Sequence, residues 1–440
     1  MTRPATPPHP AHQPPLRVLY CHPGAQMYGS DRMALQTVAM LEQSGMRVTT
    51  VLPETGELLT RLRAQHADVR LLRVPVLRKS LLRPAGFARF AAQSWAGLRR
   101  ARRGIRHLGI NVVVVNTLTQ PVWILAARLA GVPVLCHVRE AEAALPRLLR
   151  GVLVSPLSLC GLVLSNSWAT DAFLHTSCLL LLPLPPTRVV YNGKDWSGYL
   201  RSEPRPLGSG GPVHLVLVGR ISPRKGQDTA IEALRQLRLR GVDARLRLVG
   251  DVFTGYEWFE TALRKSVQTA GLGEYCTFSG FVGDVADELQ RADIVLVPSR
   301  VEPFGTVAAE GMAAKRVTVV SHVQGLTEIV QNGISGIVVD PENPSSWADA
   351  VASLVADPSW ALELARAGHE RVSRVFSAAA YADGVLRAVH DVARGRRAPA
   401  LSVVSERAPG TEPTRPRQQA PLAHEPRHRS AHDERREGHS

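Results

Sequence analysis

Short runs of apolar residues alternate along the chain with longer segments whose apolar positions recur at helical spacing. Parallel strands that are buried on both faces have such continuous apolar runs, and a helix between two of them completes a βαβ unit. In the first half, the runs that predict strands are LRVLYCH (16–22), RVTTVLP (47–53), NVVVVNT (111–117), VPVLCHV (132–138), GLVLSNS (161–167) and RVVYNG (188–193). They indicate a parallel-sheet domain over residues 16–195.

A second series of the same kind follows a segment rich in Gly, Pro and Ser at 201–212, which is typical of a linker. Its predicted strands are VHLVLVG (213–219), ARLRLVG (244–250), CTFSGFV (276–282), DIVLVPS (293–299), VTVVSHV (317–323) and GIVVD (336–340). Between the first two, Ile231, Leu234 and either Leu237 or Leu239 recur near helical spacing and should cover one sheet face. The fold class is therefore α/β, with a second Rossmann-like domain over 213–375.

The two ends of the chain differ from these domains in composition. Residues 376–396 have a helical pattern, and this helix could cross back to the first domain. Residues 1–15 and the basic segment 397–440 are rich in proline, with too few apolar groups to offset the entropy of ordering, so both are predicted to be disordered. The N-terminus also lacks the apolar run of a signal peptide, which favours a cytoplasmic protein.

Composition excludes several classes of protein. Hydrophobic residues make up 45% and charged residues 21% of the 440 residues, as in globular proteins of two or three domains. The five cysteines are odd in number and contain no CxxC pair, so neither a disulfide framework nor a zinc site is indicated. The uncharged segment 151–170 approaches membrane-spanning length, but Pro156, Ser165 and Asn166 interrupt it and favour a buried strand followed by a loop.

Positive charge is concentrated in part of the first domain. The net charge is +15, and residues 61–106 contain thirteen Arg or Lys against one acid, Asp68. Such a field attracts anionic lipid, phosphorylated substrates or nucleic acid, although a solvated basic surface without a partner explains it equally well. Aromatic residues make up only 5% of the chain and no nucleic-acid-binding motif occurs, so no nucleic-acid partner is expected. If the basic stretch has a partner, an anionic membrane surface is the one favoured.

Candidate chemistry begins after the first strand of the second domain. Arg220 and Lys225 lie in the turn that joins this strand to a helix. Open α/β sheets bind ligands at the carboxyl ends of their strands, and a following helix N-terminus attracts phosphate, so a diphosphate would fit here. A pair of surface basic residues in an ordinary turn is the alternative.

The segment 297–315 holds two acids at a helix start. Glu302 precedes Phe304, Gly305 and Thr306, and Glu310 follows one turn into the predicted helix. Carboxylates at a crevice can accept hydrogen bonds from sugar hydroxyls, and two of them could hold two different sugars. Gly305 would let the backbone approach a ligand closely. The alternative is a capped surface helix.

These two segments resemble glycosyltransferase family four, the retaining transferases of GT-B architecture, over roughly residues 16–390. The acids flanking PFG match the E-x7-E signature of that family, and Gly219 to Gly226 match GRxxxxKG. The resemblance implies two Rossmann-like parallel-sheet domains facing across a cleft. It also implies site residues: Gly219, Arg220 and Lys225 at the donor diphosphate, Glu310 at the ribose, Glu302 at the transferred sugar, Phe304, Gly305 and Thr306 as backbone contacts, and Val282 at the base.

In the first domain the resemblance points to two further positions. Gly24 and Gly29 fall in the loop after the first strand, where family members carry a glycine-rich loop that faces the donor and acceptor, although an ordinary strand-to-helix turn fits equally well. His137 matches the histidine that family members place beside the transferred sugar, with Arg139 and Glu140 in support. A histidine packed in the core is the alternative.

The function expected from this resemblance is hexosyl transfer from a nucleoside diphosphate sugar to an acceptor hydroxyl with retention of configuration. Arg220 and Lys225 would supply the positive charge that a metal supplies elsewhere, and no DxD pair occurs in a suitable loop, so neither metal nor cofactor is expected. The acceptor would be a saccharide or a lipid-linked molecule, in polysaccharide or glycolipid synthesis at the inner face of the membrane. A nucleotide-sugar epimerase of the same architecture and a basic nucleic-acid-binding protein are the alternatives.

Overall fold

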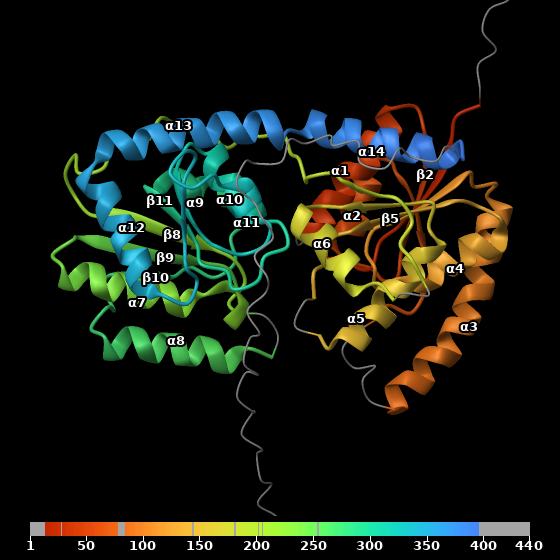
Figure 1. Cartoon of the computed structure of the whole chain (residues 1–440), viewed down its shortest axis with the longest axis horizontal. Helices are drawn as coiled ribbons and strands as arrows, with labels where there is room; N and C mark the ends of the chain where they lie inside the picture. The colour runs from red at the N-terminus through yellow and green to blue at the C-terminus, as the bar shows by residue number, and fades with distance from the viewer. Residues whose placement is uncertain are drawn as a thin grey trace, which may run out of the picture.

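The computed structural model describes residues 14–27, 29–77, 84–142, 145–179, 182–200, 202–204, 206–252 and 255–395. They form two α/β domains that lie side by side (Figure 1). The segments predicted to be disordered lie outside the described residues, except for 14 and 15.

The first domain is built on a seven-stranded sheet with the order β3-β2-β1-β4-β5-β6-β7. All its pairings are parallel, and the four residues of β4 are all buried, as expected for a sheet covered on both faces. Its strands are β1 (Arg17–Cys21), β2 (Arg47–Leu52), β3 (Asp68–Leu71), β4 (Val112–Val115), β5 (Val134–Val138), β6 (Leu162–Ser165) and β7 (Thr187–Val189). The helices are α1 (Gly29–Gln43), α2 (Glu57–Ala64), α3 (Pro84–His107), α4 (Pro121–Ala130), α5 (Arg147–Val154), the 3-10 helix η2 (Ser155–Leu159) and α6 (Trp168–Ser177).

The second domain has a six-stranded parallel sheet with the order β10-β9-β8-β11-β12-β13. Its strands are β8 (Val213–Val218), β9 (Ala244–Val249), β10 (Cys276–Phe278), β11 (Ile294–Val297), β12 (Val317–Ser321) and β13 (Ile337–Val339). The helices are the 3-10 helix η3 (Pro223–Lys225), α7 (Gln227–Leu239), α8 (Glu257–Thr269), α9 (Val285–Arg291), α10 (Thr306–Ala313), α11 (Leu326–Ile329), α12 (Pro344–Ala356) and α13 (Pro358–Val375). On α7, Leu237 is buried, whereas Leu239 is 74% exposed, so Leu237 is the residue that covers the sheet.

The last described helix, α14 (Ala378–Ala393), returns to the first domain. Figure 1 shows α13 and α14 running along one side of both domains. Val385, Val389 and Val392 of α14 are buried in the same hydrophobic cluster as strands β1, β2 and β4 of the first sheet. Arg188 at β7 forms an ion pair with Asp391 at 3.0 Å. The second domain is thus held to the first by the end of its own chain.

The loops that follow the strands of the two sheets contact each other across the domain interface. Ser167, just after β6, donates a hydrogen bond from Oγ to the carbonyl of Pro303 in the loop after β11, at 2.6 Å. Arg224, in the turn after β8, lies 3.5 Å from Glu142 in the segment after β5. The carboxyl ends of both sheets therefore face the same interface.

The uncharged segment 151–170 does not form a single long helix. It contains the end of α5, η2, β6 and the first residues of α6. Among the described residues, none of the helices combines the length and the apolar character needed to cross a membrane.

Candidate active site

The switch in strand order brings the predicted cation and acid of the second domain together. β8 pairs with β9 on one side and with β11 on the other, and chain connections diverge at such a point to leave a crevice. Lys225, from the turn after β8, donates from Nζ to Oε2 of Glu302, from the loop after β11, at 2.6 Å. Ser299 Oγ lies 3.4 Å from the same oxygen. Arg220 is exposed at the carboxyl end of β8, beside Gly219, and its carbonyl accepts a bond from the buried Gln227 at 3.0 Å.

Two glycines allow these loops to approach other backbone closely. Gly226, which ends the turn, has a φ of +69°, and a Cβ there would lie 2.0 Å from the carbonyl oxygen of Pro298. Gly305, before α10, has a φ of +113°, and a Cβ there would lie 2.5 Å from Leu326 Cδ2. A larger residue at either position would push the loop away from its neighbour and adopt an unfavourable backbone conformation.

The second acid, Glu310, has two partners that the sequence does not predict. Glu310 is only 5% exposed on α10, and its Oε1 accepts hydrogen bonds from Tyr199 OH at 2.8 Å and from Lys194 Nζ at 3.0 Å. Burial raises the pKa of Tyr199, and the Glu310 carboxylate adds to this effect. Both partners come from the segment after β7, more than a hundred residues away in the chain, so no local pattern marks them. Each predicted acid is therefore paired with a lysine.

The remaining predicted residues of this domain are Phe304, Thr306 and Val282. Phe304 is 4% exposed and packs edge-on against Phe376, with ring centroids 5.9 Å apart, so its side chain belongs to the core. Thr306 is the first residue of α10. Val282 is partly buried against the same core, whereas the preceding Phe281 is 63% exposed. The side chains of Phe304 and Val282 thus pack against the domain core.

In the first domain the loop after β1 is shorter than expected. Gly24 lies in this loop, but Gly29 is the first residue of α1 and so does not belong to it. His22, at the end of β1, donates from Nε2 to Oδ1 of Asp31 at 2.7 Å, since its Nδ1 accepts a bond from Asn116 Nδ2 at 2.8 Å. This contact joins the first turn of α1 to the end of the strand.

His137 lies at the carboxyl end of the first sheet as a neutral hydrogen-bond donor. Its side chain is buried, and Arg139 NH2 donates to its Nδ1 at 3.2 Å, which assigns the proton to Nε2. Burial holds the pKa of His137 well below its ordinary value, and the charge of Arg139 lowers it further. Nε2 is buried and has no hydrogen-bond partner among the described residues. A buried N–H donor without a partner is suited to a ligand hydroxyl.

Arg139 connects this histidine to other parts of the chain. It donates from Nε to Asn116 Oδ1 at 2.8 Å, from NH2 to the hydroxyl of Tyr381 on α14 at 3.0 Å, and from NH1 to Asn192. Glu140, the other residue expected to support the pocket, accepts a bond from the main chain of Arg139 at 3.1 Å. In the described part of the chain, no cluster of three or more His, Cys, Asp or Glu side chains is arranged to hold a metal ion.

Comparisons with known proteins give the same classification for both halves of the chain. The family model "Glycosyl transferase 4-like domain" matches residues 28–173, and "Glycosyl transferases group 1" matches residues 202–371. A glycogen synthase of Mycobacterium tuberculosis is 33% identical over 216 residues, which cover 48% of this chain and 50% of that protein. A GDP-mannose-dependent alpha-(1-6)-phosphatidylinositol monomannoside mannosyltransferase of the same organism is 36% identical over 170 residues, which cover 36% and 42%. The chain thus spans half or less of the length of these relatives.

A solved structure shows the same architecture over most of the chain. Anabaena Alr3699/HepE, in complex with UDP and glucose, superposes with a TM-score of 0.71 at 22% identity. The match covers 85% of this chain and 99% of that one. The two parallel-sheet domains, with the carboxyl ends of their strands at a shared interface, therefore have the GT-B arrangement.

Proposed function

Since its two halves match these two glycosyltransferase models, the chain belongs to glycosyltransferase family four, and we propose that it transfers a hexosyl group from a nucleoside diphosphate sugar to an acceptor hydroxyl. The observation that carries this proposal is the contact of Lys225 with Glu302 at the switch point of the second sheet, 2.6 Å long. A cation and an acid at this place can hold a phosphate and a sugar hydroxyl side by side.

The donor subsite follows from this contact. Arg220 and Lys225 bind the diphosphate, because both extend from the turn after β8 and Lys225 lies near the start of α7. Glu310 holds the ribose hydroxyls, with Lys194 fixing its carboxylate. Glu302 accepts hydrogen bonds from the transferred sugar. The base lies against the main chain at Val282, and the backbone of Gly305 and its neighbours contacts sugar and phosphate.

The proposed reaction keeps the anomeric configuration without a carboxylate nucleophile. Retaining hydrolases use a carboxylate that attacks the sugar, whereas in this proposal Glu302 accepts hydrogen bonds from the sugar hydroxyls and serves as a binder. The acceptor attacks from the face that the leaving phosphate vacates, and the phosphate takes the acceptor proton. Lys225 and Arg220 stabilise the charge on the departing diphosphate, so that neither metal nor cofactor is required. His137 donates from Nε2 to a hydroxyl of the sugar.

A thermal-shift panel of nucleoside diphosphate sugars tests this function. A ligand that binds only the folded protein raises its apparent stability, so the correct donor increases the melting temperature. We expect Lys225→Ala and Glu310→Ala each to abolish the shift, and Glu302→Ala to weaken the part that depends on the sugar. The anomeric configuration of the product, read by NMR, tests retention, and full activity in excess EDTA tests metal independence. If no donor shifts the wild-type protein, the proposal is wrong.

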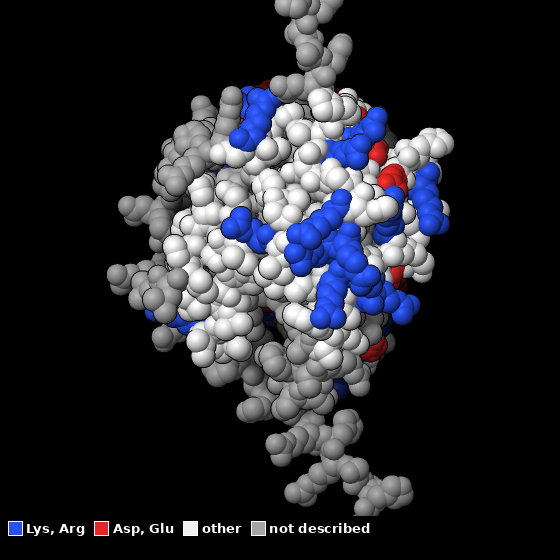
Figure 2. Space-filling view, turned by 90° about the vertical axis from the view of Figure 1, so that its right-hand side faces the viewer, with Lys and Arg blue, Asp and Glu red and all other residues white. Residues whose placement is uncertain are grey.

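For the acceptor we propose a saccharide or a lipid-linked molecule presented at an anionic membrane surface. The supporting observation is a basic face on α3, where Arg side chains gather over this end of the first domain (Figure 2). Trp95 is 60% exposed with Arg99 stacked on it at 4.8 Å, and Leu125 and Leu129 of the adjacent α4 are 40% and 46% exposed. Interfacial binding needs this mixture of cations and apolar groups.

Vesicle flotation tests the membrane part separately from the transfer reaction. Vesicles with anionic lipid should retain the protein at low salt, and retention should fall when Trp95→Ala is combined with Arg99→Glu. The same substitutions should leave donor binding unchanged, because neither residue is among those proposed to hold the donor. Equal retention on neutral vesicles would contradict the electrostatic part of the proposal.

A further inference from the structure

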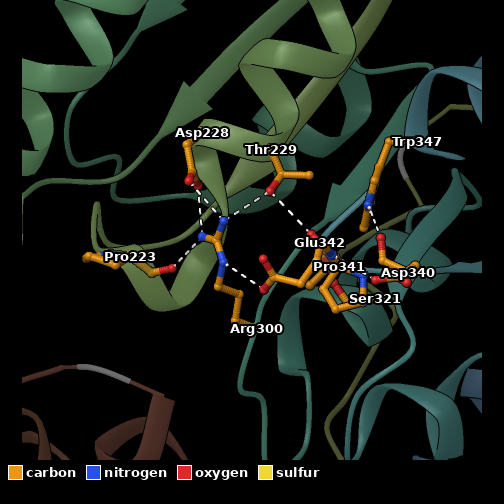
Figure 3. A network of polar contacts seen from close by, with 10 residues as sticks. Pro223, Asp228, Thr229, Arg300, Ser321, Asp340, Pro341, Glu342 and Trp347 are labelled. Carbon is orange, nitrogen blue, oxygen red and sulfur yellow. Dashed lines mark hydrogen bonds and ion pairs between the residues drawn. The ribbon is translucent and has the colours of Figure 1, made fainter. Parts of the chain in front are cut away.

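Arg300 uses its whole guanidinium group within the protein, in the loop between Pro298 and Glu302. NH1 and NH2 donate to Oδ1 and Oδ2 of Asp228, each at 2.9 Å, as a bidentate pair. NH1 also donates to the carbonyl of Pro223 at 2.8 Å. Figure 3 shows the guanidinium directed at these groups. Its fixed planar geometry makes such an arrangement specific to arginine.

The remaining donors of the same side chain reach two further segments. Nε donates to Oε1 of Glu342 at 3.1 Å, and NH2 lies 3.4 Å from Thr229 Oγ1. With the contacts above, all five N–H groups of the guanidinium are directed at protein oxygens, and the group has no donor left for a ligand phosphate. A direct role in binding the donor is therefore not its function.

The partners of Arg300 belong to the turn that carries Lys225. Pro223 is the first residue of η3 and Lys225 is the last. The main-chain N–H of Arg300 donates to the carbonyl of Arg224 at 2.9 Å, so both the backbone and the side chain of Arg300 hold this turn. Asp228 lies in the first turn of α7, directly after it. One residue thus fixes the turn at both of its ends.

This network is anchored in the domain core. Thr229 Oγ1 donates to the carbonyl of Pro341 at 3.4 Å, and the indole of Trp347 donates to the carbonyl of Asp340 at 2.9 Å (Figure 3). Trp347 is fully buried on α12. The loop before α12, the start of α7 and the loop after β11 are therefore connected in one polar network beside the buried Trp347.

We infer that Arg300 is a positioning residue of the donor site, which acts through Asp228 and the carbonyls of Pro223 and Arg224 to hold Lys225 in register with Glu302. The inference rests on the proposed function, since it assigns Lys225 to the diphosphate. Without the hydrogen bonds of Arg300, the turn that carries Lys225 samples more conformations in the free protein, and donor binding must then order it. The loss falls on the phosphate that Lys225 contacts, whereas contacts to the base and ribose come from other loops.

Calorimetric binding of a nucleoside diphosphate and its monophosphate to the full chain tests this inference. The wild-type protein is first titrated with UDP, GDP, ADP and dTDP, and the nucleotide that binds most tightly is used with its monophosphate. In Arg300→Met, and to a similar extent in Arg300→Lys and Asp228→Asn, the diphosphate should bind about tenfold more weakly while the monophosphate changes less than about twofold. The double variant of Arg300→Met with Asp228→Asn should be no weaker than Arg300→Met alone.

Arg240→Met is the matched control, because Arg240 also joins α7 to α12. Its NH1 lies 2.6 Å from Asp349 Oδ1. This ion pair lies at the C-terminal end of α7, whereas the turn that carries Lys225 precedes the N-terminal end. We expect this variant to bind both nucleotides as the wild type does. Equal loss of the two nucleotides in Arg300→Met, or an unchanged diphosphate affinity, would overturn the inference while the proposed function stands. If the wild type binds none of the four diphosphates, the proposed function fails and this inference with it.

Discussion

Replacing Glu302 by glutamine should make the protein bind a free nucleoside diphosphate more tightly. The substitution keeps the shape of the side chain but removes the charge that Lys225 contacts at 2.6 Å. The two side chains are only 16% and 28% exposed, so water screens the pair incompletely. A charge-assisted hydrogen bond of this kind contributes about 1.5 to 3 kcal/mol. A diphosphate must draw Lys225 away from this partner and also approach the carboxylate's negative charge, and both costs disappear in the variant.

If half of that interaction is recovered, the gain is about 0.75 to 1.5 kcal/mol, which is about three- to twelvefold in affinity for the diphosphate. Isothermal titration calorimetry with the nucleoside diphosphate and with its hexose conjugate measures both effects. The conjugate should gain less or lose affinity, because the sugar hydroxyls lose a charged acceptor. Glu260→Gln, which removes an acid paired with Arg264 on α8 at 2.7 Å, controls for net charge. Unchanged or weaker diphosphate binding in Glu302→Gln, or an equal gain in the control, would refute the reasoning.

Three other predictions concern Lys194, Glu328 and Arg139, which lie outside the turn that carries Lys225. Lys194→Met leaves the buried Glu310 without its lysine and should lower the free energy of unfolding by about 1 to 3 kcal/mol in urea. Burial raises the pKa of Glu328 from 4.5 to about 7. The stability that Glu328 contributes is therefore full below pH 4.5 and is lost as the pH rises through 7. Glu328→Gln should make the free energy of unfolding depend less on pH over this range, as measured by urea titrations at successive pH values. Arg139→Met should raise the pKa of His137 and so shift the acid limb of the kcat profile to higher pH, whereas an unchanged profile would exclude this role.

Continuous apolar runs allowed most of the fold to be predicted from the sequence. β4 and β11 consist of apolar residues that are buried on both faces, and their position between helical segments implies parallel pairing. β3 was not predicted, because Asp68–Leu71 lies at the sheet edge and only one of its residues is even partly buried. An edge strand with polar residues has no periodic signal that separates it from a loop.

The sequence predicts the local spacing of the candidate-site residues, but it does not predict their long-range contacts. Glu302 and Glu310 stand out because seven residues separate them across a helix start. The pairing of Glu310 with Lys194 and Tyr199 depends on the path of the chain between the domains, which no local pattern encodes. Arg300 was likewise not identified, since its importance arises from four segments that meet only in the folded domain.

The most direct test of the account is a crystal structure of the full chain with its nucleoside diphosphate sugar. We predict that the diphosphate oxygens lie within about 3 Å of Lys225 Nζ and of the Arg220 guanidinium, with the ribose at Glu310 and the hexose at Glu302. Lys225 would then have exchanged its carboxylate partner for phosphate. A nucleotide bound elsewhere, with Lys225 still paired to Glu302 and no phosphate beside it, would contradict the central claim.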